Sequence, residues 1–291
     1  MAYTEFFATQ RAGASDLNGG GPRLGSGGGE DGYILELTDT QYEDGEAYVF
    51  NDGGTGWPGV LPNDYLLIDI EGTKQMRRVS SIDGDYCYVQ GQMEGTKENV
   101  ITRVGGAWAT LQRAADVVHG GLYDSNGNPP RVNIKNDAVW TENILTVNDG
   151  TAAFPVTFEG YETTPGDGGV VEIDGDGLGV AVVSIGHIYN KFKNIYAHTS
   201  DAGFAAFIIG GNFAQFVNCQ GLATGAGASS FYLSAQYVLL VNCYSPDSAA
   251  YGFRIYADSM CIGCIALSAG TIGFATSSNQ NTFVNLSLIH I

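Results

Sequence analysis

Positive charge is scarce in this sequence of 291 residues. Lys and Arg together number 13 against 31 Asp and Glu, which gives a formal net charge of −18 at pH 7. A chain this acidic repels nucleic acid and anionic membrane surfaces, so we expect neither as a partner. Residues 178–291 are formally neutral (3 − 3), so residues 1–177 carry the whole negative charge.

Cysteine and long hydrophobic runs are also scarce. The five cysteines lack the spacing of a disulfide framework, and the CxxC at Cys261–Cys264 has no second pair or nearby histidine to complete a zinc site. No apolar run of about 18 residues is present, so we expect no membrane insertion. The opening MAYTEFFATQ has no basic segment followed by an apolar core, so we expect no signal peptide and synthesis in a cytoplasm.

A six-residue pattern recurs through the second half of the chain. Its copies FKNIYA, FVNCQG, LVNCYS, CIGCIA and FVNLSL begin at residues 192, 216, 240, 261 and 283. The steps are therefore 24, 24, 21 and 22 residues, a period that is typical of solenoid proteins. A second series, Phe204, Phe231, Phe253 and Phe274, follows the third residue of a copy by 10, 13, 11 and 11 residues, and three of these phenylalanines stand in Gly-Phe pairs.

The repeats have the pattern of strands. Runs of three to six apolar residues rich in Val, Ile, Phe and Tyr are broken by Gly, Ser and Asn, without the helical spacing of i, i+3, i+4 and i+7. The sequence therefore predicts an all-β protein that contains a single-stranded parallel β-helix, with one coil per repeat. Successive coils would stack at about 4.8 Å, the spacing between neighbouring strands.

Stacking places like residues above one another. We expect Phe192, Phe216, Leu240 and Phe283 to stack in the core. We expect an inward asparagine ladder at a bend of the coil, with a local weak point at Gly263; its members are Asn194, Asn218, Asn242 and Asn285. The ladder is followed directly by Cys219, Cys243 and Cys264. These alternate with isoleucine and leucine in other coils, which indicates small buried hydrophobic side chains rather than a redox or metal site.

Residues 105–120, GGAWATLQRAADVVHG, predict a short amphipathic helix with Trp108, Leu111, Ala115 and Val118 on one face. This helix, a GG pair and the strands that follow resemble the entry to right-handed β-helices of the pectate-lyase-like superfamily. The resemblance implies that the helix covers the open end of the first coil. The predicted β-helix then occupies residues 121–291.

The chain also resembles right-handed β-helix virion proteins of tailed bacteriophages, of the tail-fibre or tailspike kind. The resemblance rests on the N-terminal MAYTEFFATQRAGASDLNGGG, on PRVNIKNDA and on VTFEGYETTPGDGG, and it covers most of the chain. It implies a fibre-like or spike-like location on the virion, contacts with other virion proteins and a homo-oligomer, for which a trimer is favoured. It brings no catalytic motif with it.

Residues 1–104 contain short alternating runs such as GYILEL, DYLLIDI and DYCYVQG, separated by Asp-Gly turns. They predict a small antiparallel β domain, which in a virion protein would serve attachment or oligomerisation. The final LSLIHI matches one reading frame of a transposon end used in sequencing-library preparation. This favours a natural chain that continues beyond residue 291, and the alternative is a genuine last strand in the repeat register.

Candidate catalytic residues are few. Hydrolysis of a glycan needs two carboxylates across the bond, and residues 178–291 offer only Asp201, Asp247 and Asp258, each in a turn-like context. A lyase needs a base and a group that neutralises the uronate. The segment HIYNKFKNIYAH makes Lys193 and His198 the best candidates, with Asp201 nearby. Solvated side chains on a strand are the alternative and the favoured interpretation.

Two further groups are candidates for binding. Asp174 and Asp176 in EIDGDG are weak candidates for metal ligation, with calcium as the ion considered, although a glycine turn explains them as well. Tyr196, Gln220 and Tyr244 lie two residues after the ladder position and predict an outward stripe, which would serve a subunit interface or stack against sugar rings.

These patterns favour a structural virion protein, a tail fibre, spike or decoration protein that contacts host-surface polysaccharide. A tailspike-type depolymerase, either a lyase or a glycosidase, is the alternative, and a bacterial surface or adhesion β-helix is a third. Whether the chain is an enzyme stays open, with the balance against it, and no cofactor is expected apart from the calcium considered above.

Overall fold

The computed structural model describes residues 3–10, 35–62, 64–68, 75–105, 107–122, 127–256, 258–267, 270–277 and 280–289. The chain divides into two compact units. Glu5–Thr110 form one unit, and Leu111–Ile291 form the other together with Met1–Thr4. The division falls between Thr110 and Leu111, and the first four residues belong to the second unit.

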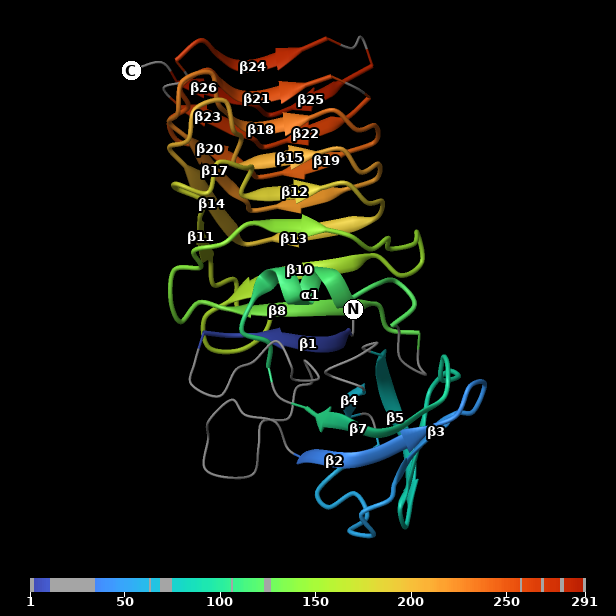
Figure 1. Ribbon diagram of the computed structural model, residues 1–291. Coiled ribbons are helices and arrows are strands. Elements are labelled where there is room, and N and C mark those ends of the chain that lie inside the picture. Colours follow the sequence, from blue (N-terminus) through green and yellow to red (C-terminus); the bar gives the residue numbers. More distant parts are fainter. Residues whose placement is uncertain are drawn as a thin grey trace. The chain divides into compact units, whose positions relative to one another are not determined.

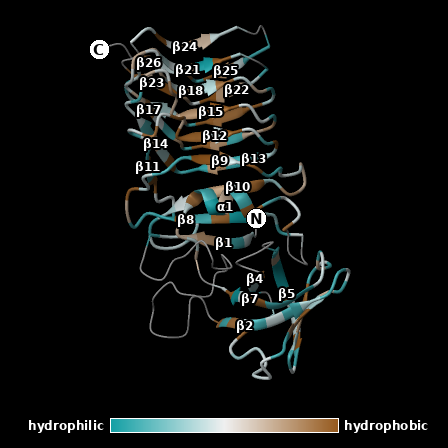
Figure 2. Cartoon of the chain, in the orientation of Figure 1, coloured by the Kyte–Doolittle hydropathy of each residue, from teal (hydrophilic) through white to brown (hydrophobic). Residues whose placement is uncertain are grey.

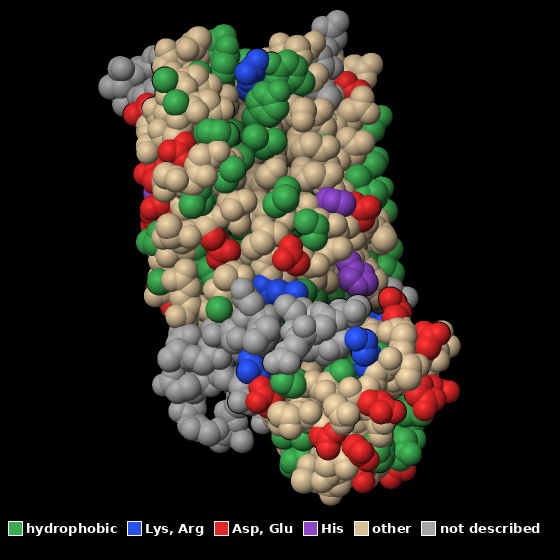
Figure 3. Space-filling model, in the orientation of Figure 1, with side chains coloured by type: hydrophobic (Ala, Val, Ile, Leu, Met, Phe, Trp, Pro, Cys, Tyr) green, Lys and Arg blue, Asp and Glu red, His purple; other side chains and the backbone are tan. Residues whose placement is uncertain are grey.

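The unit Glu5–Thr110 contains a closed antiparallel β-barrel with the strand order β2-β3-β6-β5-β4-β7, which confirms the predicted antiparallel β region. Its interior is apolar, with Val49, Leu66, Val79, Cys87 and Val104 fully buried. In Figure 3 acidic side chains gather on the surface of this unit. The barrel strands are β2 (Leu35–Tyr42), β3 (Tyr48–Asn51), β4 (Tyr65–Ile68), β5 (Gln75–Asp83), β6 (Tyr86–Val89) and β7 (Lys97–Val104), and β1 spans Thr4–Ala8.

The other unit is a parallel β-solenoid, as predicted, and its coils contribute strands to three sheets (Figure 1). The first sheet contains β8 (Pro130–Lys135), β10 (Val156–Tyr161), β13 (Asn190–Lys193), β16 (Gln215–Val217), β19 (Leu239–Val241), β22 (Met260–Ile262) and β25 (Thr282–Val284). The second contains β11 (Val171–Asp174), β14 (Ile195–Thr199), β17 (Gln220–Ala223), β20 (Tyr244–Ser245), β23 (Ile265–Leu267) and β26 (Ser287–Ile289). The third contains β9 (Ile144–Thr146), β12 (Val183–Ile185), β15 (Phe207–Ile209), β18 (Ser229–Leu233), β21 (Tyr251–Ile255) and β24 (Ile272–Thr276).

The helix α1 is shorter than predicted and spans Leu111–Val117, so Trp108 and Val118 lie outside it. It packs against β9, where the Gln112 side chain bonds both the N–H and the carbonyl of Leu145. The Glu142 carboxylate accepts hydrogen bonds from the backbone N–H groups of Leu111 and Gln112 at 2.9–3.1 Å. These are donors that a helix N-terminus leaves unpaired, and the carboxylate also suits the positive end of the helix.

Stacked aromatic rings form much of the solenoid core. Figure 2 shows hydrophobic residues along β12 and β15, whose inward side chains alternate with outward ones. In the third sheet the rings of Phe207, Phe231, Phe253 and Phe274 stack with centroids 4.8 Å apart. The predicted series placed Phe204 in this row. That assignment is wrong, because Phe204 lies in a turn and Phe207 pairs with Phe231.

The first sheet stacks as predicted over most of its length. Phe192 and Phe216 stack at 5.7 Å, and Leu240 follows in register. Cys261 pairs with Leu240 and with Phe283, and Phe283 is 37% exposed rather than buried.

The inward asparagine ladder is wrong for all but one member, although one of its hydrogen bonds forms, from Asn218 Nδ2 to Asn194 Oδ1 at 3.4 Å. Asn218, Asn242 and Asn285 are exposed, and among the predicted members only Asn194 is buried. All four have φ between 52° and 55°, the left-handed conformation that asparagine tolerates better than most residues. This conformation turns the chain from the first sheet into the second and directs the side chains outward. Gly263 has φ 63° at the equivalent corner, so it supplies the same backbone geometry and leaves no gap.

The cysteines behave as small hydrophobic side chains, as predicted. Cys219, Cys243 and Cys264 are buried and free, and each thiol lies 3.5–3.8 Å from a carbonyl oxygen of the preceding coil. Burial raises the pKa of Cys219 to about 12, so this thiol stays protonated at neutral pH. No helix in the described ranges is long and apolar enough to cross a membrane.

Candidate functional site

The structure joins three predicted residues into one group. The histidine cluster, Glu172, Asp174, Asp176 and His198, lies on the outer side of the second sheet, on and beside β11 and β14. Alternation along β14 buries Ile195 and directs His198 outward, and β11 pairs with β14 so that Asp174 is opposite His198. His198 Nε2 lies 3.0 Å from Glu172 Oε1, and His198 Nδ1 lies 3.6 Å from Asp174 Oδ1. Both ring nitrogens therefore face carboxylates.

Asp174 and Asp176, predicted as metal candidates, come within reach of this histidine. One ligand atom from each of Asp174, Asp176 and His198 lies within 4.8 Å of the others. Both carboxylates also serve the backbone, because Asp174 accepts from Asp176 N at 2.9 Å and Asp176 accepts from Ser200 N. Two carboxylates and an imidazole fall short of the six to eight oxygens that calcium takes, so the donor set does not fit that ion.

Tyr196 lies beside the cluster, with its ring centroid 5.3 Å from that of His198. Burial and the charges of Glu172, Asp174 and Asp176 raise the pKa of the Tyr196 phenol. The phenol therefore stays protonated at neutral pH. It can donate a hydrogen bond or stack against a ligand, and it does not supply a phenolate base.

Lys193 is engaged elsewhere. It projects from the first sheet, and its Nζ lies 3.3 Å from Glu159 Oε2. The Glu159 side chain is only 6% exposed and also pairs with Arg131 at 2.9 Å, while the Tyr3 ring lies 4.4 Å from the Arg131 guanidinium. A buried carboxylate between two cations is a structural ion-pair network, in which each charge compensates the burial of another. The structure does not bring Lys193 and His198 into one site.

Asp201 serves a turn. Its two carboxylate oxygens accept hydrogen bonds from Gly177 N at 3.2 Å and Gly179 N at 2.8 Å. Both glycines have positive φ, so the carboxylate holds a tight loop of the preceding coil. With both oxygens occupied in this way, Asp201 is a poor candidate for acid–base chemistry.

The predicted outward stripe forms in register. Tyr196 pairs with Gln220, which pairs with Tyr244, and all three side chains are half-buried. Glu172 precedes Tyr196 in the same row, and Ile265 follows Tyr244. The stripe therefore runs from the histidine cluster along the second sheet and becomes apolar at Ile265.

A second row of aromatic rings lies at the corner between the third and first sheets. This corner row consists of Tyr189, Phe213 and Tyr237. The ring centroids are 4.7 and 5.1 Å apart, with interplanar angles of 5° and 13°. Phe213 is 38% and Tyr237 is 55% exposed. All three residues have φ between 55° and 61°, a conformation in which bulky side chains are uncommon.

The signals for two of these features are present in the sequence. Each residue of the corner row stands five positions before an asparagine corner, so an aromatic residue recurs at the same 24-residue interval. Glu172 was not among the candidates because the recognisable repeat begins at Phe192. In later coils one or two residues separate the strands of the first and second sheets. In the coil before Phe192, nine residues (162–170) separate β10 from β11, and this longer connection hides the repeat period.

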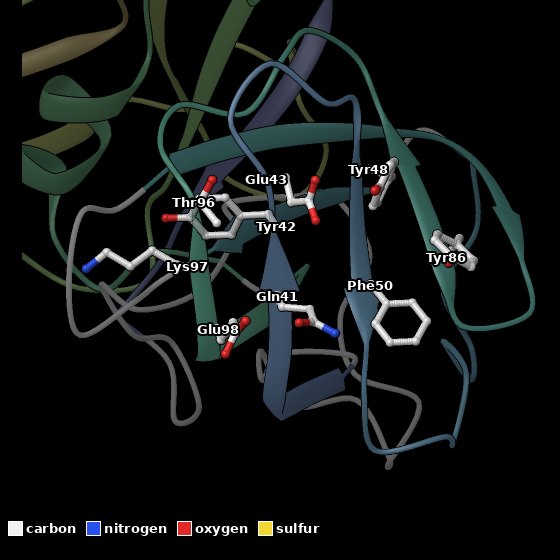
Figure 4. A pocket seen from close by; sticks show the side chains of 9 residues that line it. All are labelled: Gln41, Tyr42, Glu43, Tyr48, Phe50, Tyr86, Thr96, Lys97 and Glu98. Carbon is white, nitrogen blue, oxygen red and sulfur yellow. The ribbon is translucent and has the colours of Figure 1, made fainter.

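The barrel carries a hollow of its own, with a volume of about 180 Å³ (Figure 4). Tyr48, Phe50 and Tyr86 lie along one side of it, and Tyr88 extends the aromatic group, with Tyr48 and Tyr86 centroids 5.3 Å apart. Glu43, Glu98 and Lys97 are also among the residues that line it. None of the predicted site residues lies there.

Comparison with known proteins gives likeness in fold alone. No family model and no curated protein matches the chain. Among solved structures, pectate lyase Pel9A is 12% identical with a TM-score of 0.37, over 56% of this chain and 50% of that one. The Gp54 tailspike of Acinetobacter baumannii bacteriophage AP22, in complex with capsular saccharide, is 10% identical with a TM-score of 0.26, over 88% of this chain and 57% of the tailspike.

The tailspike gp49 of Pseudomonas phage LKA1 gives the same identity and TM-score, over 88% of this chain and 46% of that protein. The chain thus spans about half the length of these structures. The likeness to these structures is therefore one of fold at low identity and low TM-score. The assignment of the β-helix itself rests on the strand register described above.

Proposed function

We propose that this chain is a structural β-helix protein of a virion, of the fibre, spike or decoration kind, and that it contacts host-surface glycan. The observation that carries the glycan contact is the corner row. A bulky residue in the left-handed conformation costs about 1–3 kcal/mol. Asparagine or glycine fits the other corner without that cost, yet three successive coils hold Tyr189, Phe213 and Tyr237 here.

Ring stacking offsets part of this strain and leaves a continuous aromatic surface. Each neighbouring pair contributes about 0.5–1.5 kcal/mol beyond the area that it buries. The outer parts of Phe213 and Tyr237 remain exposed to solvent. Aromatic faces pack against the C–H faces of sugar rings, and polar side chains beside them bond the hydroxyl groups. Gln215, on the strand that follows Phe213, is half-buried and supplies such an amide.

The candidate catalytic residues favour a structural role. Lys193 pairs with buried Glu159, and Asp201 holds the loop at Gly177 and Gly179. Glycoside hydrolysis requires two carboxyl groups that face the scissile bond, with one of them protonated to serve as the acid. Lys193 has no carboxyl group, and both carboxylate oxygens of Asp201 accept hydrogen bonds from the loop. Neither residue therefore supplies that pair of carboxyl groups.

The corner row is tested by binding. The double substitution Phe213→Asn with Tyr237→Asn removes two rings and keeps a residue that tolerates the left-handed conformation. Across a panel of bacterial capsular and lipopolysaccharide-derived glycans, we expect binding to weaken about tenfold, since two aromatic contacts are lost. Val170→Ala, another exposed apolar position, is the matched control and should bind normally.

Equal binding by the double variant and the wild type would show that the row does not contact glycan. Loss of a sedimenting oligomer in the double variant would instead assign the row to a subunit interface. Sedimentation of the wild type tests the proposed homo-oligomer directly. A search for the protein in purified particles tests the virion location against the alternative of a bacterial surface protein.

A depolymerase is the second candidate, and the histidine cluster is the observation that favours it. His198 lies between the carboxylates of Glu172 and Asp174 with 18% of its side chain exposed, and an imidazole held by carboxylates is a group that general acid–base catalysis commonly uses. Incubation with the same panel, followed by reducing-end release and ultraviolet absorbance of unsaturated products, tests this function. Activity that is lost in His198→Gln and kept in Asp247→Asn would establish the depolymerase, and a blank from folded protein would exclude it for the panel.

A further inference from the structure

We propose that Arg254, with Tyr232, Tyr251 and Tyr256, forms a subsite that binds the carboxylate of an acidic saccharide. These four residues are called the arginine subsite below. It lies on the third sheet and shares no residue with the histidine cluster or the corner row. The saccharide part of this inference rests on the proposed glycan-binding function, whereas carboxylate binding by the guanidinium is tested independently.

Three aromatic rings surround the guanidinium. The Arg254 Cζ lies 5.4 Å from the ring centroid of Tyr232, 5.1 Å from that of Tyr251 and 4.9 Å from that of Tyr256. Tyr232 belongs to β18 and pairs in register with Arg254 on β21, and its ring lies 5.5 Å from that of Tyr256. Contacts of this kind hold the cation in place and orient its plane without using its N–H donors.

The guanidinium has no anionic partner. Within the described residues, Arg254 makes neither an ion pair nor a hydrogen bond through its side chain, and its interactions are the three ring contacts. Other arginines differ, since Arg103 pairs with Glu36 at 2.6 Å and Arg131 pairs with Glu159 at 2.9 Å. Arg254 is half-buried, so a rigid fork of five donors is held at the surface with no acceptor from the protein.

The surrounding charge makes this arginine distinctive. Arg254 is the only Lys or Arg among residues 194–291, in a protein of net charge −18. Figure 3 shows a basic side chain bordered by hydrophobic ones near the end of the solenoid that carries β21 and β24. A positive group on a wall that carries few other charges attracts anions to that position.

The chemistry favours a carboxylate on a sugar. A planar guanidinium matches a carboxylate through two parallel hydrogen bonds. A single guanidinium balances the single negative charge of a hexuronate, whereas a phosphate monoester carries between one and two negative charges and offers three acceptor oxygens. The tyrosine rings offer faces for the sugar ring and hydroxyl groups for its polar edge.

The first test compares two ligands that differ only at the carboxylate. A hyaluronan hexasaccharide and its carboxyl-reduced counterpart are titrated into the full chain by calorimetry. We expect the acidic form to bind at least tenfold more tightly, with a difference that shrinks as salt is raised. Arg254→Gln should remove this preference, and Arg254→Lys should restore only part of it, because lysine lacks the planar fork. Lys97→Gln, which removes one exposed positive charge from the barrel, is the matched control and should keep the preference.

The second test does not depend on saccharide length. In the NMR spectrum of protein with labelled arginine, the Nε–Hε resonance of Arg254 is the one that disappears in Arg254→Gln. Sodium glucuronate should shift this resonance, and glucose should leave it unchanged. No shift, together with equal binding of the two hexasaccharides, overturns the arginine subsite. If that resonance shifts but no glycan of the panel binds, carboxylate recognition is supported and the proposed glycan-contacting function fails. If glycan binding depends on Phe213 and Tyr237 but not on Arg254, the proposed glycan-contacting function is supported and the arginine subsite is rejected.

Discussion

Alanine and glycine substitutions at Asn218 should have the reverse of their usual order of stability. In regular structure, glycine is about 0.5–1 kcal/mol less stable than alanine because it loses more backbone freedom on folding. Asn218 has φ 54°, where a Cβ approaches the following carbonyl oxygen and costs an ordinary residue about 1–2 kcal/mol. The structure therefore predicts that Asn218→Gly is more stable than Asn218→Ala.

The size of the difference follows from these two terms. Glycine avoids the left-handed penalty and keeps its entropic cost, so Asn218→Gly should exceed Asn218→Ala in free energy of unfolding by about 0.5–1 kcal/mol. Both variants lose the 3.4 Å hydrogen bond from Asn218 Nδ2 to Asn194 Oδ1, so this bond does not affect the comparison. Gly263→Ala should be destabilising for the same reason, since φ there is 63°.

Urea unfolding followed by circular dichroism measures the effect, with a change in midpoint at constant m read as a change in stability. Val217, one residue earlier on the extended strand β16, supplies the control pair, and there the alanine variant should be the more stable one. If Asn218→Ala equals or exceeds Asn218→Gly in stability, the left-handed corner does not explain the asparagine row. An amide ladder would then regain support, because both substitutions would remove it equally.

Three further predictions concern the core, the thiols and a loop. Phe231→Ala should cost about 3–5 kcal/mol in unfolding free energy, because its ring stacks on Phe207 and Phe253 at 4.8 Å, and a cost below about 1 kcal/mol would contradict a close-packed stack. Cys219 should resist alkylation at pH 8 until urea unfolds the chain, because burial raises its pKa to about 12; rapid labelling of folded protein, read by mass spectrometry, would refute this. Hydrogen bonds from the backbone N–H groups of Thr164, Thr163, Gly169 and Glu162 hold the pKa of Asp167 well below its ordinary value. This carboxylate should therefore stabilise its loop above the ordinary pKa of about 3.9 and lose that effect only as the pH falls further, and carbon NMR titration with an ordinary midpoint would contradict it.

The coil register was accessible from the sequence because it is local and periodic. Phe192 and Phe216 stand in matching hexapeptides, and strand pairing at constant spacing forces them into contact. The third sheet was harder to place, because the turn between the second and third strands varies in length from coil to coil. A glycine–phenylalanine pair at Gly203 suggested Phe204, whereas pairing with Phe231 selects Phe207.

The direction of the corner side chains could not be predicted from periodicity. A repeat fixes which residues lie above one another, and it leaves open whether they face the core or the solvent. At Asn218 the left-handed backbone conformation directs the side chain towards solvent. Gly263 has the same conformation at the equivalent position without any amide, which indicates that the corner requires a backbone conformation rather than a hydrogen-bond ladder. The histidine cluster was accessible only in part, because its Glu172 belongs to a coil whose pattern is interrupted by residues 162–170.

Two left-handed corners recur along the solenoid, and their residues distinguish folding from function. At the first corner the sequence uses asparagine or glycine, which agree with the backbone, and local preference and fold are consistent. At the second corner Tyr189, Phe213 and Tyr237 oppose that preference. In the next coil Asp258 occupies the equivalent position, and it does not have the left-handed conformation. A fold that needed only the turn would not require aromatic rings there, since the first corner forms without them. Departures of this kind concentrate at sites that are retained for binding, which is why the corner row, rather than the better-satisfied Lys193 and Asp201, is the surface on which a glycan contact should first be tested.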